Sequence, residues 1–184
     1  GTAAPHTRIA FTTGSTATLR VPGLPPPDSA AMPTPWRVLI VDDHPIVRTG
    51  LAALVDAEPD LQVCGHAADV DEALRTLDAL APDVVLVDLS LRESNGLDFV
   101  KEATRRDVRT IVVSMQDKPI WVERCLAAGA VGYVQKSDAG RCVVTAIQRA
   151  RARRIYVSES MSELLLSHRQ GRERNGSTKE KRTD

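Results

Sequence analysis

The sequence lacks an excess of charge of either sign, and it lacks any long apolar run. Its 24 Lys and Arg residues balance its 24 Asp and Glu residues, so the formal net charge is zero. No overall field therefore attracts the chain to nucleic acid or to an acidic membrane, and such a partner has to be met by a local surface. The longest apolar runs, such as Val84–Val87, span only a few residues, whereas a helix that crosses a bilayer needs about 20. We expect a soluble protein that does not enter a membrane.

Cysteine is also scarce, and its spacing excludes the common disulfide and zinc frameworks. Cys64, Cys125 and Cys142 are odd in number and widely separated. They form no C-x-x-C pair, and no histidine accompanies them at zinc-ligand spacing. Free thiols in a reducing cytosol are the simplest interpretation, so we expect a cytoplasmic protein.

One folded domain is expected between two tails. Residues 1–35 hold seven of the eleven prolines and few charges, so this segment cannot build a core and is predicted to be disordered. Residues 158–184 begin with a short amphipathic helical piece, from Met161 to Leu166, and continue as a basic linker or tail that is also predicted to be disordered. Residues 36–157 remain as a single domain.

Short apolar runs alternate with helix-period stretches throughout this domain. Three of the runs are continuously apolar, which is typical of parallel strands that helices cover on both faces. Pro45 and the Asp69–Glu72 pair are signals for helix starts. The pattern predicts an α/β fold with five parallel strands and five helices, and the strand runs are Val38–Val41, Leu61–Cys64, Val84–Val87, Ile111–Val113 and Val131–Val134.

Polar side chains follow four of these runs. Asp42 and Asp43 end the first run, Asp88 the third, Ser114 the fourth and Lys136 the fifth. Each alone is a common helix cap or solvated residue. In a parallel sheet, however, ligands bind beyond the carboxyl ends of the strands, and neighbouring strands lie about 4.8 Å apart. Three carboxylates crowded there require a cation, and oxygen ligands of this kind suit Mg²⁺.

The residues at these strand ends resemble those of a known family. The motifs are RVLIVDDHPIVRTGL with its acidic pair, VVLVDLSL around Asp88, IVVS ending at Ser114, and GAVGYVQK ending at Lys136. Together they resemble the response regulator receiver domain of two-component systems, and most of all the receivers of NarL/FixJ-type regulators. The resemblance covers about Arg37 to Ser160 and implies a doubly wound, flavodoxin-like five-stranded parallel sheet of order 2-1-3-4-5.

The resemblance also implies roles for the site residues. Asp88 would be the nucleophile that accepts a phosphoryl group from the phosphohistidine of a sensor histidine kinase. Asp42, Asp43, Asp88 and the backbone carbonyl of Ser90 would bind Mg²⁺. Lys136 would pair with the phosphoryl oxygens. Such a domain is not an enzyme with a separate substrate, because it catalyses only its own phosphoryl transfer and dephosphorylation.

A switch and its output follow from the same resemblance. The Ser114 hydroxyl would move to the phosphoryl group, and the ring of Tyr133 would turn inward, changing the surface formed by the fifth strand run, Val131–Val134, and the helices before and after it. That face is also the expected site of homodimer formation. On composition alone, Tyr133 is equally well explained as a half-buried strand residue.

The resemblance leaves two outputs open. NarL/FixJ-type relatives continue into a helix-turn-helix domain, which needs several helices, whereas 27 residues follow Val157. The chain is therefore either a receiver without its transcriptional output domain, through which alone it would meet DNA, or a natural single-domain regulator or adaptor that acts by protein contact.

Two other classes share part of the pattern. A phosphatase of the haloacid dehalogenase class also uses a strand-end aspartate with Mg²⁺, but it needs a D-x-D motif, and Asp88-Leu89-Ser90 lacks the second acid. A flavodoxin-like nucleotide binder needs a first loop rich in Gly, Ser or Thr, and Asp42-Asp43 would repel its phosphate.

Overall fold

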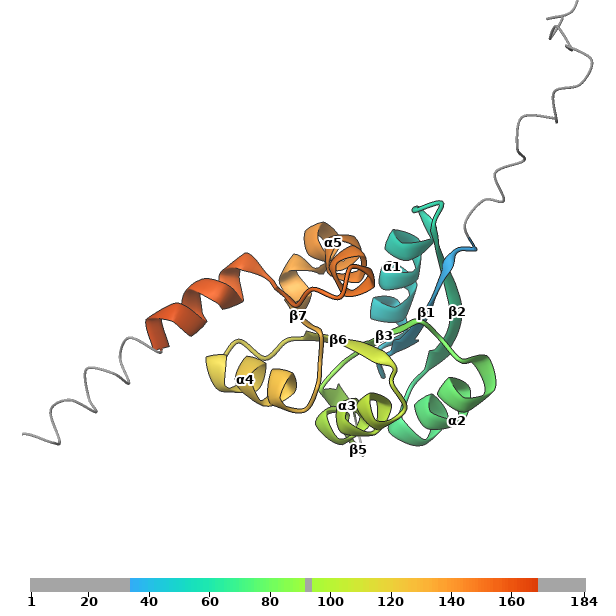
Figure 1. Ribbon diagram of the computed structural model, residues 1–184, viewed down its shortest axis with the longest axis horizontal. Coiled ribbons are helices and arrows are strands. Elements are labelled where there is room, and N and C mark those ends of the chain that lie inside the picture. Colours follow the sequence, from blue (N-terminus) through green and yellow to red (C-terminus); the bar gives the residue numbers. More distant parts are fainter. Residues whose placement is uncertain (1–33, 92–93, 169–184) are drawn as a thin grey trace, which may run out of the picture. The chain divides into compact units, whose positions relative to one another are not determined.

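A central parallel sheet with helices on both faces forms the described domain (Figure 1). The computed structural model describes residues 34–91 and 94–168. The predictions of disorder for the amino-terminal segment up to residue 33 and for the tail from residue 169 lie outside the described residues. None of the described helices is long and apolar enough to span a bilayer.

Six parallel strands make up the sheet. They are β1 (Trp36–Val41), β2 (Leu61–Ala67), β3 (Val84–Val87), β6 (Arg109–Ser114), β7 (Gly132–Gln135) and β8 (Tyr156–Val157). Their order is β2-β1-β3-β6-β7-β8, so the first five positions confirm the predicted 2-1-3-4-5 arrangement. The short strand β8 was not predicted. A two-stranded antiparallel ribbon, β4 (Ser90–Leu91) with β5 (Ser94–Asn95), forms in the loop after Asp88.

The helices begin at the signals that the sequence carries. Pro45 occupies the first turn of α1, and the Asp69 carboxylate accepts a hydrogen bond from the Glu72 amide at 2.8 Å at the start of α2. Gly129, with φ +102°, follows α4. The helices are α1 (Pro45–Asp56), α2 (Val70–Leu80), α3 (Gly96–Arg105), α4 (Pro119–Ala127), α5 (Ala139–Arg151), the 3₁₀ helix η1 (Lys136–Asp138) and a further helix over residues 159–168.

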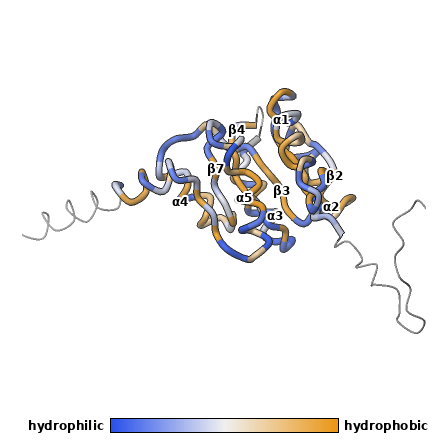
Figure 2. The backbone as a smooth tube through the Cα atoms, turned by 90° about the horizontal axis from the view of Figure 1, so that it is seen from above, coloured by the Kyte–Doolittle hydropathy of each residue, from blue (hydrophilic) through white to orange (hydrophobic). Residues whose placement is uncertain are grey.

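Two apolar layers hold the helices to the sheet. On one face α1 and α5 pack through residues such as Val55 and Ile147. On the other face α2, α3 and α4 pack through residues such as Phe99 and Val122, and Met161 of the last helix joins them. All four residues of β3 are buried, and the strand is apolar along its length (Figure 2). Burial on both faces is the reason that this strand has no alternating pattern.

Candidate functional site

The predicted phosphoacceptor, metal-binding and catalytic residues lie at the carboxyl edge of the sheet, while Tyr133 lies within β7. Asp42 and Asp43 follow β1, Asp88 follows β3, Ser114 is the last residue of β6, and Lys136 follows β7. These four strands are neighbours in the sheet and run parallel, so their ends meet at one edge. The structure therefore brings together side chains that are up to 94 positions apart in the sequence, as the distance from 42 to 136 shows.

Lys136 is the centre of this cluster. Its Nζ atom lies 2.7 Å from Asp42 Oδ2 and 2.6 Å from Asp88 Oδ2. Asp42 and Asp88 are only 1% and 2% exposed. Buried carboxylates are stable only when they are paired or hydrogen-bonded, so this one ammonium group compensates two of them.

The same contacts control the charge of Lys136. Burial alone would lower its pKa, because an ammonium group is less stable away from water. The hydrogen bonds from Lys136 to Asp42 and Asp88 act against burial, and together they raise the pKa above that of an ordinary lysine. Lys136 is therefore a cation throughout the neutral range.

A third carboxylate and an imidazole complete a group of possible metal ligands. Asp42, Asp43, His44 and Asp88 each offer a ligand atom, and these atoms all lie within 4.8 Å of one another. His44 Nδ1 lies 2.7 Å from Asp43 Oδ1, and the His44 amide donates to Asp42 Oδ1 at 2.8 Å. Carboxylate oxygens gathered this closely are the ligands that a hard divalent cation prefers.

The loop after β3 also contacts Asp88. The Ser90 amide donates to Asp88 Oδ1 at 3.2 Å, while the part of Ser90 as a metal ligand stays a prediction. Gly96, the first residue of α3, lies directly against the Asp88 carbonyl, and a Cβ atom at this position would also come within 2.7 Å of Leu89 Cα. The glycine thus lets α3 begin immediately beside the aspartate.

Ser114 and Tyr133 are linked through the loop that follows β6. Ser114 is fully buried, and its Oγ accepts from the Gln116 amide at 3.2 Å. Tyr133 is also fully buried, and its phenol donates to the Gln116 carbonyl at 2.8 Å. Burial is the main cause of the strongly raised pKa of Tyr133, so the phenol remains a neutral donor. The ring lies inward rather than in the half-buried position that composition alone suggested.

The sequence reasoning missed the contacts that three residues make at this site. His44 is the cap residue before α1, and its ring also contacts Asp43. The Arg48 side chain donates to the Asp42 carbonyl, and Gln116 joins Ser114 to Tyr133. One signal pointed to His44 and Arg48, because both lie in the turn and the first helix directly after the acidic pair. Gln116 has no signal, because its backbone makes both bonds.

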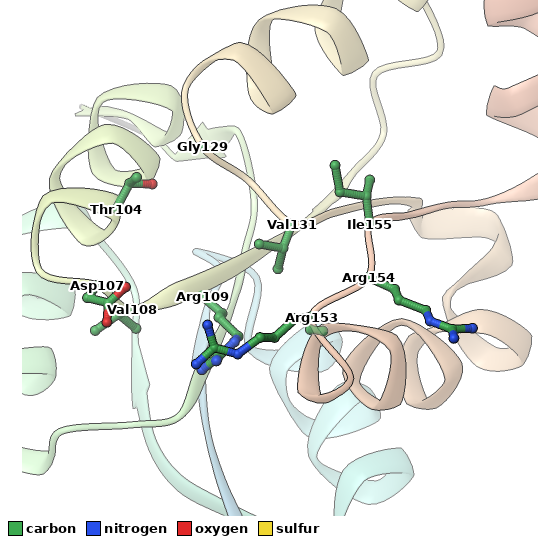
Figure 3. Close-up of a pocket in the computed structure, with 10 residues that line it drawn as sticks. Thr104, Asp107, Val108, Arg109, Gly129, Val131, Arg153, Arg154 and Ile155 are labelled. Atoms are coloured by element: carbon green, nitrogen blue, oxygen red, sulfur yellow. The ribbon is translucent and has the colours of Figure 1, made fainter.

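A separate hollow of about 250 Å³ lies at the opposite, amino-terminal edge of the sheet. Arg109, Arg153 and Arg154 line it, and the first two point towards each other there (Figure 3). The ends of α3 and α5 border the hollow. The carbonyl ends of helices carry partial negative charge that basic side chains offset, so these arginines have a structural explanation. None of the predicted site residues lines this hollow.

The comparison with protein families identifies the domain. The model of the response regulator receiver domain matches residues 38–148. The match begins within β1, includes the other four strands of the predicted order, and contains every predicted site residue.

Curated relatives are transcriptional regulators. The chain is 37% identical over 116 residues to the transcriptional regulatory protein LiaR of Bacillus subtilis, covering 62% of this chain and 55% of LiaR. It is 30% identical over 133 residues to the nitrate/nitrite response regulator protein NarL of Escherichia coli, covering 71% of this chain and 62% of NarL. The chain thus spans somewhat more than half the length of these relatives.

Solved structures agree with the sequence comparison. A two-component response regulator of the LuxR family from Aurantimonas superposes with a TM-score of 0.71 at 32% identity, over 74% of this chain and 99% of that one. The isolated receiver domain of RcsB from Salmonella enterica, with the phosphomimetic BeF₃⁻, superposes with a TM-score of 0.67 at 26% identity, over 72% and 99% of the two chains. The chain belongs to the response regulator receiver family, and its relatives are response regulators of the NarL and LuxR type.

Proposed function

We propose that the chain accepts a phosphoryl group on Asp88 from the phosphohistidine of a sensor histidine kinase. The observation that carries this proposal is the contact of the Lys136 ammonium group with both Asp88 and Asp42, at 2.6 and 2.7 Å. An aspartate beside a buried cation at the carboxyl edge of a parallel sheet is suited to phosphoryl transfer, because the negative charge of the transferred group is offset where it arrives.

The transfer replaces one bond to phosphorus with another. An oxygen of Asp88 attacks the phosphorus atom, the new O–P bond forms as the N–P bond of the phosphohistidine breaks, and the electron pair leaves on the imidazole nitrogen. Lys136 then pairs with a phosphoryl oxygen in place of the free carboxylate. The domain acts on itself in this reaction and has no separate substrate.

A magnesium ion completes the proposed site. Asp42, Asp43 and Asp88, with the backbone carbonyl of Ser90, would hold it, and when bound it supplies positive charge to the phosphoryl oxygens. The donor set supports this assignment, because its carboxylate oxygens lie within 4.8 Å of one another. Asp42 and Asp88 are also nearly fully buried, with the ammonium group of Lys136 between them.

Ser114 and Tyr133 are the residues whose contacts change when Asp88 is phosphorylated. Ser114 lies at the end of the strand next to β3, so its hydroxyl is placed to donate to a phosphoryl oxygen. In doing so it would release the Gln116 amide and change the loop whose carbonyl accepts from the inward Tyr133 phenol. The affected surface consists of α4, β7 and α5, and it is also where we place a homodimer contact.

The downstream effect we propose is control of transcription in the cytoplasm, through an output domain outside this chain. The relatives LiaR and NarL carry names of transcriptional and response regulators, and this chain spans 55% and 62% of their lengths. The alternative is a single-domain regulator or adaptor that acts by protein contact.

The test of the phosphoacceptor is Mg²⁺-dependent labelling by a radioactive small phosphodonor. Wild-type protein is expected to take up label with Mg²⁺ and to lose it with a chelator, and Asp88→Asn is expected to take up none. Asp98→Asn is the matched control, because Asp98 is an exposed acid of α3 that pairs with Lys101, and it should label like wild type. Equal labelling of wild type and Asp88→Asn would overturn the assignment.

A further inference from the structure

The chain that follows α5 returns to the strand that carries Tyr133. β8 pairs with β7 in parallel, with Tyr133 opposite Val157. The Ser158 amide then donates to the Tyr133 carbonyl at 3.0 Å. The helix over residues 159–168, called the docked helix below, begins immediately after this bond. Its start is thus hydrogen-bonded to the proposed switch residue.

One face of the docked helix is part of the protein core. Met161 is fully buried, in the same apolar cluster as Tyr133 and Val122. Leu165, one turn later, packs against this cluster. The opposite side of the helix faces solvent, since Leu164 and Leu166 are 43% and 62% exposed. The pattern shows a helix with a defined inner face and not a solvated linker.

A hydrogen bond ties the start of the docked helix to the segment around Lys136, and the other end of the helix lies near α4. Near its start, the Ser160 hydroxyl donates to Asp138 Oδ2 at 2.7 Å and lies 3.3 Å from Gln135 Oε1. Gln135 and Asp138 lie on either side of Lys136 in the sequence. At the other end, His168 Nδ1 lies 4.0 Å from Glu123 Oε1 on α4. Figure 1 shows the helix running from the end of β8 towards α4.

We propose that the docked helix is the element that transmits the state of the phosphoryl site to the chain beyond residue 168, and that phosphorylation of Asp88 strengthens its docking. This inference rests on the proposed function. The inward Tyr133 ring belongs to the apolar cluster that buries Met161, and an outward ring would remove its volume from that cluster. Phosphorylation that draws Ser114 away and favours the inward ring therefore favours the docked helix.

The coupling has a second route through Lys136. A phosphoryl group that repositions this lysine acts on the short segment from Gln135 to Asp138, which the Ser160 hydroxyl bridges. Because coupling between two sites is reciprocal at equilibrium, a loosened helix must also weaken the binding of a phosphoryl mimic. This reciprocity gives two independent measurements of one effect.

The experiment combines beryllofluoride, as the phosphoryl mimic, with hydrogen exchange measured by mass spectrometry on the full chain. With Mg²⁺ and beryllofluoride, amide exchange in residues 161–168 is expected to slow by about 5-fold or more. Met161→Ala should abolish this slowing and weaken beryllofluoride affinity by a similar factor. Leu166→Ala is the matched control on the exposed side of the same helix, and it should retain both properties.

Ser160→Ala tests the same coupling if Met161→Ala does not fold, because it removes the hydrogen bond to Asp138 without opening a cavity in the core. It should reduce both effects and leave the exchange of β3 unchanged. If Asp88 is labelled by the phosphodonor while exchange in residues 161–168 stays the same or becomes faster, the inference is overturned and the proposed function stands. If Asp88 is not labelled, the proposed function fails and the inference fails with it.

Discussion

Charged side chains gather at both edges of the sheet, but they are buried and paired at one edge and exposed to solvent at the other. At the carboxyl edge, Asp42 and Asp88 are buried and share the Lys136 ammonium group. At the amino edge, Arg153 and Arg154 are exposed beside the ends of helices. Exposed charges remain hydrated and contribute little. A candidate site thus differs from a solvated surface because its charged side chains are buried and contact one another, and the number of charges matters less.

The largest difference between the edges is expected when one cation is removed from each. Lys136→Met leaves two buried carboxylates without their ammonium partner and is expected to lower the free energy of unfolding by about 3–5 kcal/mol. Arg153→Met, at the exposed amino edge, should change it by no more than about 0.5 kcal/mol. Urea denaturation in a chelating buffer measures both. Equal losses would contradict the comparison.

The stability lost in Lys136→Met is expected to depend on pH. The pKa of Lys136 is raised in the folded protein, so its ion pairs contribute fully below the ordinary lysine value of about 10.4 and are lost as the pH rises through the raised pKa. The stability difference between wild type and Lys136→Met is therefore expected to be constant in the neutral range and to shrink in the alkaline range above that value.

A smaller effect is expected from backbone packing at the carboxyl edge. A Cβ atom at Gly96 would meet the backbone of Asp88 and Leu89, which cannot rotate away. Gly96→Ala is expected to lower the free energy of unfolding by about 1–3 kcal/mol and to reduce labelling of Asp88. Gly140→Ala, in the first turn of α5, meets nothing within 4 Å and should gain up to about 1 kcal/mol. Thermal unfolding of the two variants gives the comparison.

The smallest effect is expected at the aromatic contact of the amino edge. The guanidinium groups of Arg109 and Arg151 lie 5.5 and 5.7 Å from the ring centroid of Trp36. Arg109→Ala removes one of these contacts and should lower the free energy of unfolding by about 0.5–1 kcal/mol, with no change in labelling of Asp88. A loss of labelling in this variant would show that the two edges are not independent.

Much of this fold could be predicted from the sequence because the strands are apolar along their length. The run Val84–Val87 coincides with β3, and Val38–Val41 lies within β1. Because parallel strands fix which ends meet, the convergence of Asp42, Asp88 and Lys136 at one edge followed from topology. The structure places these three side chains in contact, while their roles in phosphoryl transfer stay predictions.

The parts that could not be predicted depend on tertiary contacts. β8 has two residues, too few for a period, and it forms because β7 offers a free edge to it. The amphipathic piece from Met161 to Leu166 was recognised as helical, but its sequence does not say which surface it packs on. The contacts of His44 and Gln116 depend on loop geometry, which composition does not encode.

The short strand β8 also limits what the sheet can do with neighbouring molecules. A long exposed edge strand offers unpaired amides and carbonyls to other chains and promotes aggregation. This sheet ends on one side in a strand of two residues that passes directly into a helix. The edge next to β7 therefore presents too little free backbone to serve as a template for strand addition between molecules.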